Sequence, residues 1–423
     1  MLDLKLIRSD PERIKAALAR RGAAERVDEL LALDARRREL LPEIESAQAE
    51  RKSLSKQIGE AKQAGGDAQG LMDEVAVLKE RIESGRAELE TVDAELERIV
   101  ASLPNLPDPG APDGAAEEDA VVLREVGERP EFDFEPRDHL EIGAELGLID
   151  MEAGARLSGS RFAYLKGDLV LLELALVRFA MERLSAEGFE PVIPPVLVRE
   201  EALFGTGFLP DTEQQIYAIP EDGLYLAGTS EVALASLHAD EILDPGTLPR
   251  RYAGFSSCFR REAGAAGRDT RGIFRVHQFD KVEMFSFVEP ASSNDEHERI
   301  LAIEEAILGE LEIPYRVVDI PVGDLGPSAA RKFDCEAWIP SQGRYRELTS
   351  CSNTTDYQAR RLGCRYRPAD GESPQAAHTL NGTAVAVGRT MIALIENRQE
   401  WDGGFTLPTI LHSFGAPERI GPV

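Results

Sequence analysis

Two long segments of regularly spaced apolar residues near the start of the chain constrain its fold more than any other feature. In the first segment, apolar side chains recur at steps of three, four or seven, at Leu33, Leu40, Ile44, Ala47, Leu54, Ile58 and Ala61. The second repeats the pattern at Leu71, Val75, Leu78, Ile82, Leu89, Val92, Leu96 and Ile99. This spacing is typical of helices that pack along one stripe. Because Gly65 and Gly66 separate the two segments, we predict an antiparallel coiled-coil hairpin over about residues 28–101.

The dimensions and flaws of this hairpin also follow from the sequence. At a rise of ~1.5 Å per residue, each predicted helix is roughly 50 Å long, so the hairpin forms an arm. Arg37 and Arg51 fall on the apolar stripe of the first helix and Gly85 on that of the second, so we expect imperfect packing there. Pro42 should bend the first helix locally.

Basic residues are concentrated on the first helix of the arm, at Arg36, Arg37, Arg38, Arg51, Lys52, Lys56 and Lys62. From charge alone, a solvated helix flank paired with Glu side chains is favoured over an RNA-binding surface, although the second alternative stays open. The net charge of −28 argues against an indiscriminate nucleic-acid binder. Sequence-independent affinity comes from Lys and Arg, so any RNA contact must use local basic patches.

A segment rich in proline, glycine and acidic residues, PNLPDPGAPDGAAEED, follows the arm. This composition is typical of a solvated linker rather than packed structure. A chain of 423 residues is also long enough for two domains. We therefore predict an N-terminal domain over 1–104, a linker over 105–125 and a second domain over 126–423.

Beyond the linker, the sequence predicts strands separated by short gaps, with occasional helices. The apolar run inside the predicted helix Leu169–Ala186 is interrupted by Glu173 and Arg178 and is too short to span a membrane. The predicted strands are Arg161–Leu165, Glu190–Leu197, Tyr252–Arg260, Phe274–Val288, Tyr315–Val318, Phe333–Trp338, Tyr345–Ser350 and Thr383–Gly388. This pattern predicts an α+β fold with an antiparallel sheet flanked by helices. The GxGxxG and GxxxxGK[ST] motifs are absent from the sequence, which disfavours Rossmann and P-loop nucleotide sites.

The N-terminal residues and the cysteines bear on the compartment. No basic region followed by an apolar core and a cleavage site is visible at the N-terminus, so we expect a cytoplasmic protein. Cys258, Cys335, Cys351 and Cys364 show no CxxC spacing. We expect these thiols to be reduced.

The densest group of candidate functional residues is CFRREAGAAGRDTRGIFRVHQFDKVEMF, residues 258–285. Arg260 and Arg275 suit phosphate oxygens, because the guanidinium is always charged and binds in fork geometry. Phe279 could stack on a purine, and Glu283 could bind an ammonium or hydroxyl group. A twisted hairpin with surface ion pairs, each worth ~0–1 kcal/mol, would explain the same residues, so both alternatives stay open at this point.

Five segments of the chain resemble the seryl branch of the class II aminoacyl-tRNA synthetases, in its bacterial form. FRRE with RVHQFDKVEMF resembles motif 2, GFEPVIPPVLV at 188–198 resembles motif 1, and NGTAVAVGRTMIALIENRQ at 381–399 resembles motif 3. LAGTSEVAL at 226–234 is similar to the serine-binding loop, and ELTSCSNTTDYQARR at 347–361 to the metal and nucleotide segment. One such motif would be weak evidence for the family, but five motifs in the expected order over nearly the whole chain are specific to it. The resemblance implies a class II synthetase catalytic domain that follows a tRNA-binding helical arm.

The resemblance also implies an activity and its partners. The expected enzyme is a serine–tRNA ligase that uses ATP and Mg²⁺ to convert L-serine to seryl-adenylate and transfers the seryl group to tRNA(Ser), with tRNA(Sec) as a further acceptor. A homodimer is implied, with Pro195 at the interface and the arm of one subunit presenting tRNA to the other. DNA and membranes are not expected partners.

Two other functions remain to be weighed against this one. A paralogue serving a natural-product or carrier-protein pathway would not need the arm. A noncatalytic scaffold should have lost phosphate-binding arginines, yet Arg260, Arg275 and Arg389 are all present.

Site residues follow from the matched motifs. The serine site would comprise Thr229, Ser230, Glu231, Arg260, Glu283, Asn381 and Thr383. The ATP site would comprise Arg260, Arg261, Glu262, Arg275, Val276, Phe279, Glu347, Leu348, Thr349, Ser350 and Arg389. Glu347 and Ser350 would hold Mg²⁺, whose preference is for hard oxygen ligands. The tRNA would contact Arg36, Arg37, Arg51, Lys52 and Lys56 on the arm, and Arg268 and Arg271 in the motif 2 loop.

The resemblance assigns a role to several of these residues. Arg260 and Arg389 would be catalytic, with Arg260 holding the α-phosphate and the serine carboxylate. Arg275 would bind the γ-phosphate, while Phe279 and Arg389 would enclose the adenine ring. Glu283 and Thr383 would read the serine hydroxyl. No protein nucleophile is needed, because the serine carboxylate attacks and the enzyme supplies positioning and charge.

Overall fold

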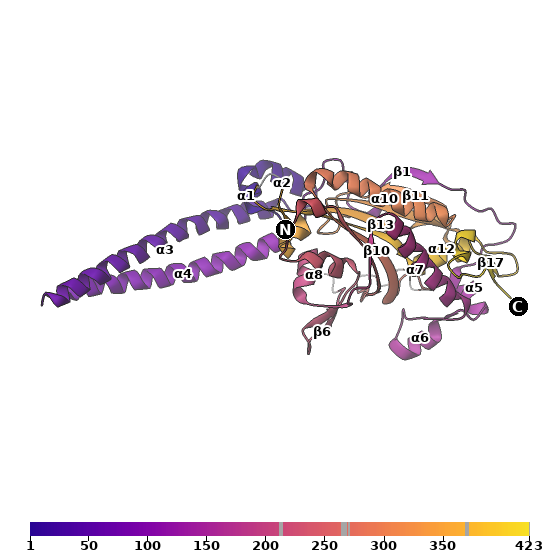
Figure 1. Ribbon diagram of the computed structural model, residues 1–423, viewed down its shortest axis with the longest axis horizontal. Coiled ribbons are helices and arrows are strands. Elements are labelled where there is room, and N and C mark those ends of the chain that lie inside the picture. The colour runs from indigo at the N-terminus through magenta and orange to yellow at the C-terminus, as the bar shows by residue number, and fades with distance from the viewer. Residues whose placement is uncertain (211–214, 264–268, 270, 369–371, 423) are drawn as a thin grey trace. The chain divides into compact units, whose positions relative to one another are not determined.

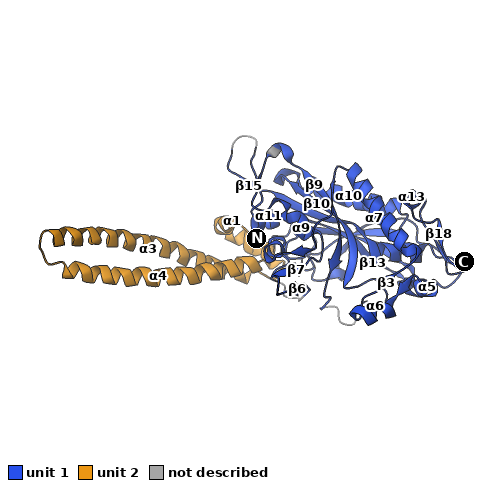
Figure 2. Cartoon of the chain, turned by 60° about the horizontal axis from the view of Figure 1, so that its bottom comes forward, with its two compact units in different colours: residues 1, 105–423 blue, residues 2–104 orange. Residues whose placement is uncertain are grey.

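The computed structural model describes residues 1–210, 215–263, 269, 271–368 and 372–422. The chain forms two compact units, one of residues Leu2–Pro104 and one of Met1 with Asn105–Val423, which Figure 2 colours separately. Among the described residues, no helix combines the length and apolar character needed to cross a membrane.

The first unit is built on a helical hairpin. Its long helices α3 (Glu25–Gln63) and α4 (Gln69–Ser102) run side by side in Figure 1, preceded by the short helices α1 (Leu4–Ser9) and α2 (Pro11–Ala19). Gly65 adopts a φ of +75°, and the Gly66 N–H donates to the Ala61 carbonyl at 2.9 Å, which closes the end of α3. The predicted coiled-coil arm is confirmed.

The seam of the hairpin differs from the sequence prediction at Gly85. A Cβ atom at this position would lie 3.0 Å from Cγ1 of Ile44, so glycine permits a close helix approach. The expected packing flaw there is wrong, because a missing side chain makes room for the isoleucine. The Arg37 side chain pairs with Asp93 on helix α4, and its Nε lies 2.6 Å from Oδ1 of Asp93. Pro42 is exposed within a continuous α3, and the local bend expected there stays a prediction.

The second unit is centred on an eight-stranded sheet. Its strand order is β1 (Val121–Val126), β11 (Tyr315–Asp319), β12 (Arg331–Ile339), β13 (Arg344–Thr355), β16 (His378–Ala386), β10 (Gln278–Val288), β9 (Arg250–Phe259) and β4 (Glu190–Val192). Neighbours are antiparallel except β4 and β9, which are parallel. The predicted α+β class with an antiparallel sheet is confirmed.

Three helices pack on this sheet and contribute to its main core: α7 (Asp168–Ala186), α10 (Ser293–Glu310) and α12 (Val387–Asn397) (Figure 1). The remaining helices and short strands are α5 (His139–Glu145), β2 (Ile149–Asp150), α6 (Met151–Ser158), β3 (Tyr164–Leu165), β5 (Leu197–Val198), α8 (Glu200–Thr206), β6 (Tyr217–Ile219), β7 (Leu224–Leu226), α9 (Glu231–Ala235), β8 (Ile242–Leu243), α11 (Tyr357–Leu362), β14 (Arg365–Tyr366), β15 (Gln375–Ala376), β17 (Phe405–Thr406), α13 (Thr409–His412) and β18 (Arg419–Ile420).

Several predicted strands have other bounds. Only Tyr164–Leu165 of the strand expected over 161–165 forms, and the run 190–197 is divided into β4 and the start of β5. Prolines at 194 and 195 cannot donate ladder hydrogen bonds, which explains that break. Strand β10 begins at Gln278 rather than 274, and β16 ends at Ala386, so that residues 387 and 388 open helix α12.

The segment 105–125 is not a solvated linker throughout. Asn105 is 2 % exposed, and its Nδ2 donates to the carbonyls of Ser328 and Thr354, both at 2.8 Å. Ala111 is buried in a small apolar cluster, and the strand that begins at Val121 pairs with β11. Prolines and glycines exclude regular structure, but here they do not prevent polar and small apolar side chains from packing on a folded surface.

Candidate active site

One face of the sheet carries a cavity of about 340 Å³, within the range of ~300–1,000 Å³ typical of small-molecule sites. Strands β10, β13 and β16 and the first turn of α12 supply much of its wall, and Arg260 joins it directly after the end of β9. Side chains alternate along a strand, so Phe279, Lys281 and Glu283 of β10 share the cavity face. The antiparallel ladder places Glu283 opposite Thr383 of β16.

This cavity brings together most of the residues that the sequence proposed for serine, ATP and Mg²⁺. The residues in its wall are Thr229, Glu231, Arg260, Glu262, Arg275, Val276, Phe279, Glu283, Glu347, Leu348, Ser350, Asn381, Thr383 and Arg389. They come from segments as far apart in sequence as 229 and 389, so only the folded sheet assembles them.

Three predicted residues do not line the cavity. Ser230 is buried and its hydroxyl donates to the Gly254 carbonyl at 3.4 Å. The Thr349 hydroxyl donates to Oε2 of Glu304 on α10 at 2.8 Å, because Leu348 lies at a register shift and Thr349 faces the helices. The Arg261 side chain is exposed.

Two buried carboxyl groups mark one end of the cavity. Oε1 of Glu231 accepts hydrogen bonds from Nε2 of Gln358 at 2.7 Å and Nδ2 of Asn381 at 3.0 Å. Burial, and next the charge of Glu283, raise the pKa of Glu231 to about 7. Burial also raises the pKa of Glu283, and Lys281 opposes that shift. This end can therefore receive a cationic and hydrogen-bonding ligand.

A cluster of cations surrounds Glu347 on β13. Nη1 of Arg389 lies 3.0 Å from the Glu347 carbonyl oxygen and 3.3 Å from Oε1. Burial raises the pKa of Glu347, but the charges of Arg389 and Lys332 outweigh it, and the net pKa falls to about 2. The Glu347 side chain keeps 46 % of its area exposed, so we attribute this shift to the charges and not to dehydration. Glu347 is therefore ionised at neutral pH.

Aromatic rings and arginines form the remaining walls. The guanidinium of Arg260 lies 5.3 Å from the ring centre of Phe279, and that of Arg389 lies 4.7 Å from Phe274. Nη1 of Arg275 is 2.6 Å from Oε2 of Glu262. Flat apolar faces beside fixed cations suit a purine nucleotide, whose base stacks while its phosphates bind arginine.

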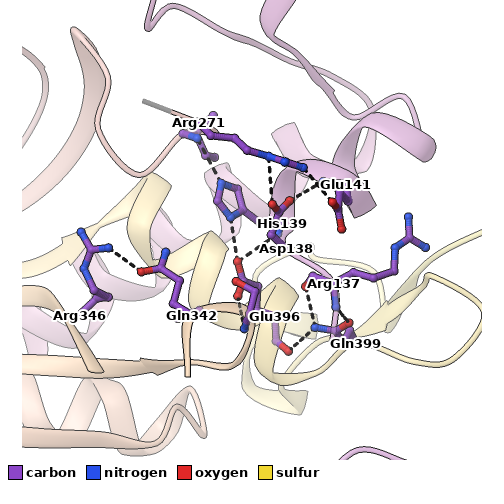
Figure 3. A network of polar contacts seen from close by, with 12 residues as sticks. Arg137, Asp138, His139, Glu141, Arg271, Gln342, Arg346, Glu396 and Gln399 are labelled. Carbon is purple, nitrogen blue, oxygen red and sulfur yellow. Dashed lines mark hydrogen bonds and ion pairs between the residues drawn. The ribbon is translucent and has the colours of Figure 1, made fainter. Parts of the chain in front are cut away.

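A polar network anchors the chain where it returns from the motif 2 loop to the cavity wall (Figure 3). The Ile273 N–H donates to Nε2 of His139 at 3.2 Å, so Nδ1 carries the proton that faces Glu396 Oε1 at 2.9 Å. Arg271 pairs with Asp138 at 3.1 Å and Glu141 at 2.9 Å. The structure thus gives Arg271, expected to meet tRNA, two carboxylate partners, and Arg268 lies outside the described residues.

Several residues of the site were not predicted from the sequence. Lys281, Lys332 and Phe274 line the cavity, and Gln358 orients Glu231. Lys281 had a usable signal, because it lies two residues from both Phe279 and Glu283 on a predicted strand. Gln358 had none, since only the fold brings α11 against α9.

The arm residues proposed to contact tRNA differ from one another in their partners and in their exposure within the hairpin. Nε of Arg36 lies 2.7 Å from Oε1 of Glu88 on the facing helix, and Arg37 pairs with Asp93 as described above. Nζ of Lys56 is 3.8 Å from Oε1 of Glu60, and Arg51, Lys52 and Lys56 are all exposed. Arg36 and Arg37 therefore support the solvated, carboxylate-paired alternative, and the residues nearer the turn remain available to an external anion.

Comparison with known proteins gives matches to both parts of the chain. A model of the seryl-tRNA synthetase N-terminal domain matches residues 1–107, and a model of the class II tRNA synthetase core domain (G, H, P, S and T) matches residues 216–398. Serine–tRNA ligases from Thermobifida fusca and Rubrobacter xylanophilus are each 50 % identical over 424 residues, covering 100 % of this chain and 99 % of the relative.

Solved structures give the same result. Seryl-tRNA synthetase from Pyrococcus horikoshii, complexed with ATP, has a TM-score of 0.94 at 42 % identity and full coverage of both chains. Cytoplasmic serine–tRNA ligase from Naegleria fowleri, in complex with AMP, has a TM-score of 0.89 at 31 % identity and covers 100 % of this chain and 99 % of its own. The similarity therefore extends over the helical hairpin and the sheet.

Proposed function

The chain belongs to the seryl-tRNA synthetase family, and from this premise we propose how its own residues activate L-serine and charge tRNA. It is an ATP-dependent class II serine–tRNA ligase. The observation that carries the residue assignments is the convergence of two buried carboxyl groups and several arginines on one cavity. A zwitterionic amino acid and a nucleotide need that combination of charges.

Serine occupies the carboxyl-lined end in this proposal. Glu231, fixed by Gln358 and Asn381, accepts hydrogen bonds from the serine ammonium. Glu283 and Thr383, opposite each other on neighbouring strands, bind the hydroxyl. Alanine would leave these polar groups unpaired, and a site built to bond a hydroxyl rejects an analogue without one by up to ~10⁴–10⁵.

ATP occupies the arginine-lined end. Phe279 and Arg389 enclose the adenine ring, Arg260 binds the α-phosphate, and Arg275 receives the γ-phosphate after exchanging its partner Glu262 for it. Backbone contacts from Val276 and Leu348 complete the nucleotide site, together with Glu262. Thr349 and Arg261 can contribute only through the backbone or from outside the cavity, given where their side chains lie.

The residues proposed for Mg²⁺ have suitable chemistry. Glu347 is ionised at neutral pH and lies in the cavity wall with the Ser350 hydroxyl, which gives two hard oxygen ligands. Mg²⁺ commonly takes one or two protein oxygens and fills its shell with water and phosphate. Bound there, it would neutralise phosphate charge. Arg389, already bonded to the Glu347 carbonyl, holds that strand segment in place.

The reaction follows from this placement. An oxygen of the serine carboxylate attacks the α-phosphorus, the bond to the bridging oxygen breaks, and pyrophosphate leaves with the electron pair. In this proposal Arg260, which lines the cavity, holds both reacting groups, so the enzyme contributes orientation and charge stabilisation to the step. In the second step a terminal ribose hydroxyl of tRNA attacks the seryl carbonyl carbon, and AMP leaves.

A homodimer is part of the proposal. Helix α7 exposes Val170, Leu171 and Leu174, and the turn after β4 exposes Ile193 by 81 % of its surface. Pro195 is exposed in the same segment. Exposed apolar side chains favour burial against a partner, and a second copy of this chain fits the interface that the motif 1 resemblance implies. Sedimentation equilibrium should give a dimer mass.

For tRNA, the hairpin is the proposed grip, and Arg51, Lys52 and Lys56, which are exposed on its first helix, are the proposed contacts. The acceptor is tRNA(Ser), and tRNA(Sec) is a further candidate. The test is charging of transcripts of tRNA(Ser), tRNA(Sec) and an unrelated tRNA with labelled serine. Charging of tRNA(Ser) alone would remove tRNA(Sec) from the proposal. If none of the three tRNAs is charged, the result would favour the alternative of a paralogue that serves a carrier protein. The full-length similarity to serine–tRNA ligases does not favour that alternative.

A further inference from the structure

Lys281 lies in the cavity wall between Phe279 and Glu283 on strand β10. It is 7 % exposed, and its Nζ contacts Oε2 of Glu283, which is 2 % exposed. Lysine is seldom buried to this degree unless it is paired. The pairing with Glu283 accounts for the burial of Lys281, but it leaves open why a buried ion pair lies in the wall of this cavity.

With serine bound at this end of the cavity, the charges balance only if Lys281 is the counter-ion of Glu283. The end holds two carboxyl groups, Glu231 and Glu283, and the nearby cations are Lys281 and Arg260. Zwitterionic serine brings one charge of each sign. Its ammonium matches Glu231 and its carboxylate matches Arg260, which leaves Lys281 as the counter-ion of Glu283. A buried carboxylate without such a partner is strongly unfavourable.

The contact also divides the two oxygens of Glu283. Lys281 faces Oε2, so Oε1 is left for a ligand and for Thr383, the register partner of Glu283 on β16. Removal of Lys281 would free the carboxyl group to rotate and to take up a proton. Either change would weaken a hydrogen bond that depends on a fixed, charged acceptor.

We propose that Lys281 is a positioning residue that sets specificity for the serine hydroxyl by keeping Glu283 charged and in one orientation. This inference rests on the proposed function, in which Glu283 binds that hydroxyl. Lys281 does not need to touch serine. Its effect should appear in the choice between serine and alanine, because alanine has no hydroxyl for Glu283 to bind.

The test compares Lys281→Met, which removes the charge at similar length, with Lys281→Arg, which keeps it. Lys79→Met on α4 is the matched control, since Lys79 is exposed and far in sequence from the cavity residues. Amino-acid-dependent ATP–pyrophosphate exchange is measured for serine and for alanine. In Lys281→Met we expect kcat/KM for serine to fall about 10- to 100-fold, as for loss of a charged hydrogen bond, while that for alanine stays within threefold. Lys281→Arg should recover part of the serine preference.

Equal losses for serine and alanine in Lys281→Met would overturn the inference, because they would indicate general damage to the site. An unchanged serine value would overturn it as well. A wild-type enzyme without serine-dependent exchange would instead defeat the proposed function, so the two failures are distinguishable.

A double variant covers the case in which Lys281→Met does not fold. Lys281→Met combined with Glu283→Gln removes both charges, which avoids an unpaired buried ion. If Lys281 acts through Glu283, the double variant is no worse for serine than Glu283→Gln alone. A double loss equal to the product of the two single losses, or a further loss beyond Glu283→Gln, would contradict the proposal.

Discussion

Arginines in the helical hairpin and arginines around the cavity are the same residue in two different environments. On the hairpin, Arg36 and its partner Glu88 keep 39 % and 46 % of their side-chain area exposed. At the cavity, Arg275 and Glu262 keep 29 % and 8 %, and Arg389 faces Glu347 beside a phenylalanine ring. Water and salt screen the first kind of pair far more than the second.

This difference in environment explains why basic residues in the sequence indicated a ligand site around the cavity but did not distinguish between possible partners of the hairpin. A row of basic residues on an exposed helix is consistent with solvent, with carboxylate partners or with RNA. Arginines on strands around a common cavity are restricted to ligands that enter it. We therefore expect substitutions at the cavity to change the chemistry strongly, and single substitutions on the hairpin to have small effects.

The largest effect is expected for Arg260→Ala. Loss of a preorganised charge at the α-phosphate should lower kcat/KM for serine-dependent exchange about 10²- to 10³-fold, equivalent to at least ~3 kcal/mol of transition-state stabilisation. Arg156→Ala removes an exposed arginine of α6, whose side chain is 71 % exposed, and serves as the control. Exchange at the wild-type rate in Arg260→Ala would move the α-phosphate site elsewhere.

The next effect concerns the hairpin as a whole. Replacement of residues 51–78 by a short glycine turn removes Arg51, Lys52 and Lys56 and shortens both helices from the end that meets the turn. Charging of tRNA(Ser) should fall about 100-fold, with the loss greatest at low salt, because the phosphate contacts that this variant lacks contribute most to nucleic-acid affinity there. Serine-dependent exchange should stay within twofold. Unimpaired charging by this variant would contradict a tRNA role for the outer hairpin.

The pH dependence of serine binding should be smaller. The pKa of Glu231 is about 7, and only its ionised form pairs with an ammonium. As pH rises from 6 to 8, the ionised fraction grows and the KM for serine should fall by about tenfold, with little change above that range. Glu283, Lys281, Arg260 and Gln358 also act on Glu231, so Glu231→Gln is the variant that isolates its share. Persistence of the same pH profile in Glu231→Gln would assign the titration to another group.

The smallest effect is expected for Arg36→Ala on the hairpin. The exposed pair with Glu88 should contribute little to the free energy of unfolding, and less as salt is added, because water and ions screen it. Chemical denaturation at two salt concentrations measures this. Arg51→Ala provides a comparison at an exposed position nearer the turn. A loss of several kcal/mol would show that the hairpin depends on this pair more than its exposure allows.

Local periodicity made much of the fold predictable. The arm follows from apolar spacing and the Gly65–Gly66 turn, and most sheet strands were found with shifted ends. The prediction of a packing flaw at Gly85 was wrong, because a single sequence does not show which side chain of the facing helix lies opposite a glycine. The buried position of Asn105 was also missed, since its partners Ser328 and Thr354 are more than two hundred residues away.

For the site, the sequence supplied residue types and the resemblance supplied roles. Strand alternation places Phe279 and Glu283 on one face, and the same rule should have included Lys281. It also places Thr349 on the opposite face from Ser350, where it bonds to Glu304. The support of Glu231 by Gln358 depends on tertiary packing and could not be read from either local sequence.

The central claim is that the cavity activates serine in preference to other amino acids. Its most direct test is ATP–pyrophosphate exchange with the full-length protein and each of the twenty amino acids. Exchange should depend on serine, with alanine, glycine and threonine far weaker. Absence of exchange with serine, or stronger exchange with another amino acid, would contradict the account.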